Sequence, residues 1–253
     1  MGACAKFSAA CLMGAVALMS ARATAASDLI VLTNQGATPG VRELAAAFSR
    51  ASGHHVTVIQ QEADALEQRI NTGPADLVTA NPGAIEELVK KGKIVPGTVT
   101  PFVLAGLGLS VRAGAPKPDI STVDAYKATL IAAKSIGYSR GCSGTNVADG
   151  IARLGLTEPL KAKTILTNGG PVADALARGD FEIGIQQTNI MVGVPGTEYV
   201  GPLPGALNKP CASSVALLAS SKEPDAARAM IRFMVSPEAA PLLRKTHVEP
   251  AKP

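Results

Sequence analysis

The sequence predicts an α/β protein of two lobes, each built on a mainly parallel β-sheet flanked by helices. Short apolar runs rich in β-formers alternate with amphipathic helical patterns along the chain, which is typical of βα units. These units form two series, separated by the apolar run 101–111 and the Pro/Gly-rich stretch 194–204. We therefore expect two hinge crossings between the lobes. The 253 residues, 47% of them hydrophobic, supply enough material for two cores.

The first series begins with a buried-strand run and an amphipathic helix. Leu29–Thr33 (LIVLT) is apolar up to its last residue. Thr38 and Pro39 supply a helix N-cap and a first-turn proline, and Gly53 ends that helix. The remaining elements of this series are expected as strands at 55–60 and 75–80 and helices at 64–71 and 85–91.

The second series follows the apolar run 101–111, which is long enough to pass from one lobe into the other. Strands are expected at 135–138, 164–166 and 181–186, and helices after Thr145 and from Gly170-Pro171. This series forms the sheet of the second lobe.

The stretch 194–204 is expected to bring the chain back to the first lobe as a linker. After it come a strand at 213–219 and helical patterns around 226–235 and 237–245. The expected division is therefore 27–104 plus 200–253 for the first lobe and 105–199 for the second.

Residues 1–26 have the three-part pattern of a cleaved signal peptide. Lys6 gives a positive start, residues 7–19 form an apolar stretch, and Ala23-Thr24-Ala25 is a small-residue cleavage site. Cleavage after Ala23 or Ala26 is an alternative. The apolar stretch is too short to span a bilayer. We therefore expect the mature protein in the periplasm.

Removal of this leader changes the charge and the cysteine count. The formal charge falls from +4 to +2, because two basic residues and no acidic one leave. Two of the four cysteines leave as well, so Cys142 and Cys211 remain. In an oxidising compartment they form a disulfide or stay as free buried thiols, and the sequence leaves both alternatives open.

The composition excludes several classes of ligand. Aromatic residues make up 3% of the chain and Trp is absent, whereas sugar clefts and single-stranded nucleic-acid sites stack their ligands on rings. The longest basic run is Lys90-Lys91, so we expect no nucleic acid. The sequence has three His and no HxH, HExxH, CxxC, Walker A or dinucleotide glycine pattern. We therefore expect neither a metal nor a cofactor.

A ligand cleft is expected between the lobes. In α/β sheets, ligands lie at the carboxyl ends of the strands, against helix N-termini. The first lobe contributes Thr33–Thr38, Gln61–Asp64 and Asn81, and the second contributes Ser139–Asn146, Gly169–Val172 and Gln186–Asn189.

Of these stretches, the segment 140–146 (RGCSGTN) has the most groups able to bind a ligand. Gly141 and Gly144 let backbone N–H groups approach an anion, and Ser143 and Thr145 add hydroxyls. Arg140 has the geometry to clamp a carboxylate. The alternative is a helix-capping loop with Arg140 in solvent.

The matching turn of the first lobe contains Asn34 and Gln35. Both are candidate ligand contacts by position, although Asn also occurs in turns without any function. Glu62 and Asp64 are candidates for a general base. Alternatively they are solvent-facing charges near a helix start, where acidic residues favour the helix dipole.

Four stretches in order give the chain a family resemblance. They are Val111–Ser121 (VRAGAPKPDIS), Ala133–Ser139 (AKSIGYS) with Cys142-Ser143-Gly144, Gly179–Gln187 (GDFEIGIQQ) and Val194–Leu203 (VPGTEYVGPL). Over most of the mature chain the sequence resembles the type II periplasmic solute-binding proteins of ABC importers, in the molybdate-binding branch. Aconitate isomerase, a secreted enzyme, is similar to this branch too. The resemblance implies the bilobed type II periplasmic-binding-protein fold.

The resemblance also implies ligand contacts at matching positions. Molybdate binders hold the oxyanion with two serines, and the matching positions here are Gly36 and Ala63, which have no hydroxyl. The family's other contacts fall at Ser143, at Gly170 and Val172 near a helix start, and at Gln187. The frame of the family is kept, whereas its molybdate chemistry is not.

We therefore expect a monomeric solute-binding protein that captures a small anion between its lobes for an ABC permease in the inner membrane. An organic carboxylate suits these residues better than a molybdate-type oxyanion. The alternative is an isomerase of the aconitate isomerase type, which moves a double bond in a tricarboxylate by proton transfer. Its candidate catalytic residues are Arg140, Glu62, Asp64 and Cys142.

Overall fold

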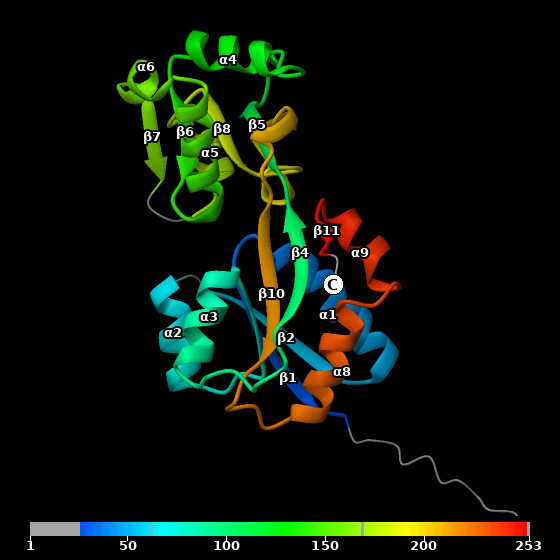
Figure 1. Ribbon diagram of the computed structural model, residues 1–253. Helices are drawn as coiled ribbons and strands as arrows, with labels where there is room; N and C mark the ends of the chain where they lie inside the picture. The colour runs from blue at the N-terminus through cyan, green and yellow to red at the C-terminus, as the bar shows by residue number, and fades with distance from the viewer. Residues whose placement is uncertain (1–25, 62, 168–169, 252–253) are drawn as a thin grey trace, which may run out of the picture.

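The protein consists of two lobes stacked one above the other (Figure 1). The structure is a computed structural model that describes residues 26–61, 63–167 and 170–251. Except for Ala26, the expected signal peptide lies outside these residues. Within the described ranges, no helix is both long and apolar enough to cross a membrane.

The first lobe is built on a six-stranded sheet of order β11-β4-β10-β3-β1-β2. Its strands are β1 (Asp28–Thr33), β2 (His55–Gln60), β3 (Leu77–Ala80), β4 (Thr100–Ala105), β10 (Cys211–Leu217) and β11 (Glu249–Pro250). β1 pairs in parallel with β2 and β3, whereas β10 runs antiparallel to both β3 and β4. The C-terminal part of the chain therefore returns to the first lobe, as the sequence predicts.

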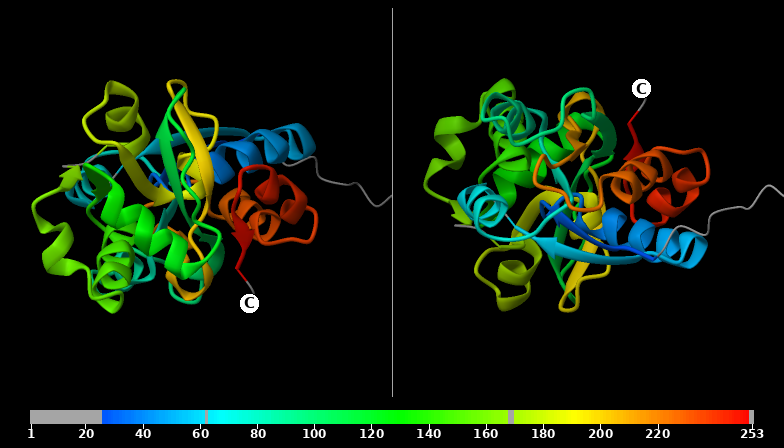
Figure 2. Two further views of the ribbon diagram at one scale, coloured as in Figure 1. Left: turned by 90° about the horizontal axis from the view of Figure 1, so that it is seen from above. Right: turned by 90° about the horizontal axis from the view of Figure 1, so that it is seen from below.

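Helices cover both faces of this sheet. They are α1 (Thr38–Ser52), α2 (Ala63–Thr72), α3 (Pro82–Lys90), α8 (Pro224–Met234) and α9 (Ala239–Lys245). α1, α8 and α9 pack side by side on one face, as both views of Figure 2 show. α2 and α3 cover the other face. Alternation along β1 explains both cores, because Leu29 and Val31 face the first group of helices and Leu32 faces the second.

The structure confirms the predicted first-turn proline and the stop signal of α1 but not the predicted N-cap: Ala37 occupies the N-cap position, and Thr38 is already helical, with its hydroxyl donating to the carbonyl of Asn34. Pro39 lies in the first turn, and Gly53 caps the end at φ 78°, in the left-handed region that favours glycine. Val41, Leu44 and Phe48 form the buried stripe, spaced three and four residues apart.

The apolar run 101–111 forms the first crossing. It is divided into β4, which belongs to the first sheet, and β5 (Leu107–Arg112), which belongs to the second. Gly106 lies between the two strands. The run 101–111 therefore passes from the first lobe into the second, as predicted.

The second lobe is built on a five-stranded sheet of order β7-β6-β8-β5-β9. Its other strands are β6 (Ile136–Ser139), β7 (Thr164–Thr167), β8 (Ile183–Gln187) and β9 (Thr197–Pro202). Its helices are α4 (Val123–Ala132), α5 (Cys142–Arg153), α6 (Thr157–Lys161) and α7 (Val172–Arg178), with the 3-10 turns η1 (Thr188–Ile190) and η2 (Gly205–Leu207). α4, α5 and α6 contribute to one core and α7 to another.

Two expectations need correction. The sheets are mixed and not mainly parallel, because the strands next to the crossings, β5, β9, β10 and β4, pair antiparallel. The stretch 194–204 is also more than a linker, since β9 pairs with β5 up to Pro202. Leu203 and Leu207 continue in the core of the second lobe. The expected boundary at residues 199 and 200 thus falls inside a strand, and the second crossing lies between Leu207 and Cys211.

Candidate functional site

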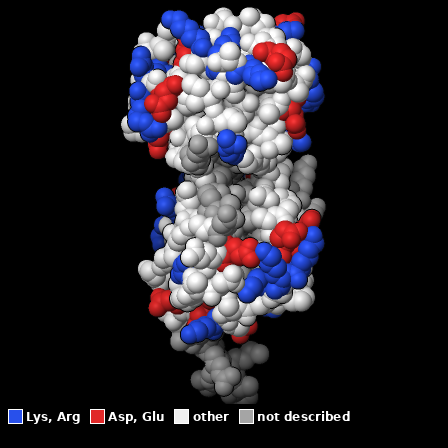
Figure 3. Space-filling model, turned by 90° about the vertical axis from the view of Figure 1, so that its left-hand side faces the viewer, with Lys and Arg blue, Asp and Glu red and all other residues white. Residues whose placement is uncertain are grey.

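A cleft of about 380 Å³ lies between the two lobes. Seen from the side, the lobes meet there at a narrow waist (Figure 3). Residues from both lobes line the cleft, at the ends of β1, β3, β6 and β8 and at the starts of α5 and β10. The lining residues are Asn34, Gln35, Gly36, Gln61, Leu66, Ala80, Asn81, Ala84, Ser139, Arg140, Gly141, Cys142, Ser143, Gly170, Gln186, Gln187, Cys211 and Ala212.

This arrangement follows from the direction of the strands. β1 and β3 are parallel neighbours in the first sheet, and so are β6 and β8 in the second. The carboxyl ends of parallel neighbours lie at the same edge of a sheet, so the turns that follow them meet at the cleft.

The structure brings most of the expected ligand residues together. Asn34, Gln35, Gly36, Arg140, Cys142, Ser143, Gly170 and Gln187 all line the cleft. Glu62 and the side chains of Ala63 and Asp64 lie outside the described part of the structure. Three expected residues are not part of the lining: Gly144, Thr145 and Val172.

These three are next to the cleft lining without being part of it. Thr145 is exposed on α5. Val172 is buried, and its backbone N–H donates to Gln186 Oε1 at 2.9 Å. A Cβ on Gly144 would lie 1.6 Å from the carbonyl oxygen of Ser139. Gly144 is therefore needed for the close packing of α5 on the end of β6.

Gln186 has a fixed amide orientation. Its Oε1 accepts the N–H of Val172, which can only donate, so its Nε2 must point the other way. That nitrogen lies 3.4 Å from Oε1 of Gln35, in the opposite lobe. Gln186 is 2% exposed and offers an N–H donor at the cleft, so both Gln186 and Gln187 reach it. Strand alternation alone predicts only one of them, but the strand ends there and turns into η1.

Asn81 is oriented in the same way on the first lobe. Its Oδ1 accepts the backbone N–H of Ala84 at 2.9 Å as the N-cap of α3. Because the oxygen already accepts this bond, Asn81 offers the cleft the N–H donors of its amide nitrogen. Two amides, one from each lobe, thus present N–H groups to the cleft.

The end of β6 and the first turn of α5 each bring one hydroxyl to the cleft wall. The hydroxyls of Ser139 and Ser143 lie 3.0 Å apart, and both residues are less than 10% exposed. Gly141, at φ 86°, is the N-cap and makes no side-chain capping bond. The turn therefore faces the cleft with hydroxyls and backbone N–H groups.

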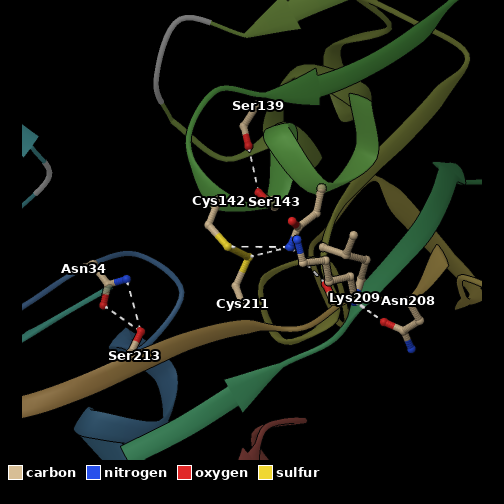
Figure 4. The surroundings of a disulfide bond; sticks show 10 residues. Asn34, Ser139, Cys142, Ser143, Asn208, Lys209, Cys211 and Ser213 are labelled. Carbon is tan, nitrogen blue, oxygen red and sulfur yellow. Dashed lines mark hydrogen bonds between the residues drawn. A yellow bond between two sulfur atoms is a disulfide. The ribbon is translucent and has the colours of Figure 1, made fainter. Parts of the chain in front are cut away.

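A disulfide joins Cys142 to Cys211 at the cleft (Figure 4). This resolves the alternative that the sequence leaves open. It also removes Cys142 from the candidate bases, because a disulfide sulfur has no proton to exchange. Sequence reasoning missed Cys211 as a cleft residue, along with Leu66, Ala80, Ala84 and Ala212. The only signal for Cys211 is that it is the second cysteine of the expected mature chain. On the lobe-1 side of this bond, Asn34 and Ser213 share a hydrogen bond of about 3.4 Å.

The described lining carries a single charged side chain, that of Arg140, and no carboxylate. No group of three or more His, Cys, Asp or Glu able to hold a metal occurs among the described residues. Leu66, Ala80 and Ala84 add an aliphatic wall. The described lining is therefore rich in hydrogen-bond donors and has an apolar side.

Comparison with known proteins places the chain in a family. The model of a family described as bacterial extracellular solute-binding protein matches residues 29–249. The chain belongs to this family. Aconitate isomerase of a Pseudomonas species is 32% identical to this solute-binding protein over 248 residues, 94% of this chain and 95% of the relative. The molybdate-binding protein ModA of Rhodobacter capsulatus is 26% identical over 87% of this chain and 88% of its own length.

The fold of this solute-binding protein is also found in a solved structure. The periplasmic molybdate-binding protein of Azotobacter vinelandii superimposes with a TM-score of 0.72 at 20% identity, covering 89% of this chain and 99% of that one. The bilobed type II architecture is thus shared, as the family resemblance implies.

Proposed function

We propose that this solute-binding protein captures a small organic carboxylate in its cleft and passes it to the permease of an ABC importer. The carboxylate lies between the lobes, held by the guanidinium of Arg140, the first turn of α5 and the amide N–H groups. Secretion through the expected signal peptide places the monomer in the periplasm.

One observation carries the anion assignment. The amide oxygens of Gln186 and Asn81 are both occupied by backbone N–H groups, so both side chains turn their amide nitrogens toward the cleft, that of Gln186 with one N–H already donated to Gln35 Oε1. Donors stabilise a negatively charged ligand and leave a cation unsatisfied. Arg140 adds the only charge of the described lining.

A second observation favours an organic anion over an inorganic oxyanion. Leu66, Ala80 and Ala84 give the cleft an aliphatic side, which suits a hydrocarbon skeleton. By the family resemblance, the positions of the two serines of molybdate binders are held here by Gly36 and Ala63. A Cβ at position 36 would meet the amide end of the Gln187 side chain, so a serine there requires that amide to move.

A ligand screen tests the proposal directly. Thermal shift and calorimetry compare citrate, trans-aconitate and malate with molybdate, sulfate and glucose. A ligand at a hundred times its Kd stabilises the fold by about 2.7 kcal/mol, which raises Tm by about 5–10 °C. We expect this shift with one or more of the carboxylates. Stabilisation by glucose alone contradicts the anion assignment.

Gln186→Glu provides a sharper test in the cleft itself. Glutamate keeps the acceptor for the N–H of Val172, but it loses the hydrogen bond to Gln35 Oε1 and adds a negative charge. Like charges about 5 Å apart at an effective dielectric constant of about 20 repel by roughly 3 kcal/mol, about a hundredfold in Kd. Gln68→Glu is the matched control, because Gln68 is exposed on α2. Unchanged carboxylate affinity in Gln186→Glu contradicts the proposed pose.

The similarity to aconitate isomerase supports a second candidate function, an isomerase on the same frame. Such a reaction needs a base that removes a proton from one carbon and returns it to another, and donors that stabilise the carbanion. Arg140 and the α5 turn would supply the donors. Since Cys142 is in a disulfide, Glu62 and Asp64 remain as candidate bases.

Proton NMR of trans-aconitate with the protein in D₂O separates the two candidates. An isomerase forms the cis isomer and incorporates deuterium, whereas a binding protein does neither while trans-aconitate still raises its Tm. If conversion occurs, Glu62→Gln and Asp64→Asn identify the base, because the responsible variant loses turnover and keeps binding.

A further inference from the structure

A covalent bond joins the two lobes beside the chain crossings. Cys142 is the first residue of α5 in the second lobe, and Cys211 is the first residue of β10 in the first sheet. The lobes are therefore connected at three places: the β4–β5 crossing, the return to β10, and the disulfide (Figure 4).

The two crossing segments touch at Gly106 and Asn208. Asn208 Oδ1 accepts the backbone N–H of Leu107 at 2.6 Å, and a Cβ on Gly106 would lie 2.9 Å from that same oxygen. The carbonyl of Gly106 accepts the N–H of Thr188 at 2.8 Å. These contacts hold the two crossing segments together at Gly106 and Asn208. Any rotation of one lobe against the other therefore pivots about this point.

The disulfide fixes the start of α5 close to this pivot. The Cα atoms of Cys142 and Cys211 are 6.0 Å apart. Since disulfides span Cα separations of at most about 6.8 Å, the first turn of α5 is able to withdraw from β10 by less than about 1 Å while the bond is intact. Asn146, 5% exposed, adds to this restraint by donating from Nδ2 to the carbonyl of Lys209 at 3.1 Å.

A non-covalent contact joins the lobes at a second point. Nδ2 of Asn189, next to β8, donates to the carbonyl of Gly36 at 2.7 Å. Asn189 is 7% exposed, so this hydrogen bond is shielded from water. A hydrogen bond of this kind breaks when the lobes separate, whereas the disulfide does not.

We propose that the Cys142–Cys211 disulfide is a hinge stop that holds the first turn of α5, with Ser143, over the cleft before any ligand arrives. The cleft is then preset close to its ligand-bound shape, and opening is confined to the Asn189–Gly36 side. The consequence for ligand affinity rests on the proposed function, whereas the restraint on the lobes rests on the described contacts alone.

Small-angle X-ray scattering without ligand tests the hinge stop. The comparison is between the oxidised wild-type protein and the double variant Cys142→Ser/Cys211→Ser, both kept below their Tm. We expect a larger radius of gyration for the variant and faster amide hydrogen exchange in the first turn of α5. Wild-type protein reduced with dithiothreitol provides the same comparison without a substitution, in case the variant does not fold.

Asn189→Ala is the matched control, because it removes the interlobe hydrogen bond to Gly36 and leaves both the disulfide and the Gln186–Gln35 hydrogen bond intact. We expect a smaller increase in the radius of gyration than in the double variant. Equal scattering and equal exchange with and without the disulfide overturn the hinge stop.

A titration with trans-aconitate as the probe measures the consequence for binding. If about one disulfide-free molecule in ten keeps the cleft walls together, the apparent Kd rises about tenfold. An unchanged Kd overturns the preset cleft. If trans-aconitate and the other carboxylates bind neither form, the proposed function fails, while scattering and exchange still decide the hinge stop.

Discussion

Gly144→Ala removes the space on which the cleft wall depends. Gly144 lies in the first turn of α5, where that turn rests on the last residue of β6. The added Cβ would lie 1.6 Å from the carbonyl oxygen of Ser139, and this oxygen is backbone that has no rotamer to change. The turn must therefore move outward and carry Ser143 away from the cleft.

The expected cost follows from the distance. Contacts of a Cβ below 3.0 Å do not occur, so the helix and the strand end must separate by roughly 1.4 Å. Overpacking of this kind costs about 1–3 kcal/mol, and the better helix propensity of alanine returns at most about 1 kcal/mol. We expect a net loss of about 2 kcal/mol, which lowers Tm by about 4–8 °C.

Thermal unfolding of Gly144→Ala and Gly150→Ala checks this reasoning. Gly150 lies in the same helix, but there the added Cβ would meet only the end of the Leu207 side chain, at 3.3 Å. We expect a change within about 0.5 kcal/mol for Gly150→Ala. Equal Tm values for the two variants, with carboxylate binding retained in both, refute the role assigned to Gly144.

Two further predictions concern buried and surface carboxylates. Asp76, 6% exposed, accepts a backbone N–H of β1 at 2.8 Å and the hydroxyl of Ser221 at 2.7 Å, so Asp76→Asn should cost about 1–3 kcal/mol in denaturant unfolding. The N–H of Gly114 and the side chain of Lys117 lower the pKa of Glu198. A carboxyl group whose pKa is lower in the folded state stabilises the fold at pH values above its pKa in the unfolded state. This stabilisation is lost as the pH falls through the pKa of the folded state. Glu198→Gln should therefore flatten the acid side of the Tm profile; an unchanged profile contradicts this.

The sequence predicts most of the fold because burial periodicity and punctuation agree along the chain. The apolar run around Gly106 predicts the first crossing, and Gly53 predicts the end of α1. The second crossing is misplaced because Pro202 and its neighbouring glycine resemble a linker. They are tolerated in β9 because it is the edge strand of its sheet, where a missing N–H leaves no ladder bond unmade.

The sequence predicts where the candidate site lies, but not the packing, amide orientation and disulfide that shape it. The carboxyl ends of parallel strands can be located from sequence, and they bring Asn34, Arg140 and Ser143 to the cleft. The role of Gly144 is not predictable, because it depends on the distance between a helix and a strand end. The same holds for Gln186, whose donor direction follows from a bond to the N–H of Val172, and for the disulfide, whose cysteines lie 69 positions apart.

The place of β10 between β3 and β4 has a consequence for how the chain is made. Until residues 211–217 leave the ribosome, β3 and β4 have no partner on their facing edges, although both were synthesised more than a hundred residues earlier. The second sheet, in contrast, is contiguous in sequence and complete at Pro202. The later lobe is thus able to fold first. A chain that stops short of β10 presents two open strand edges, the feature that leads nascent chains to aggregate or to need a chaperone.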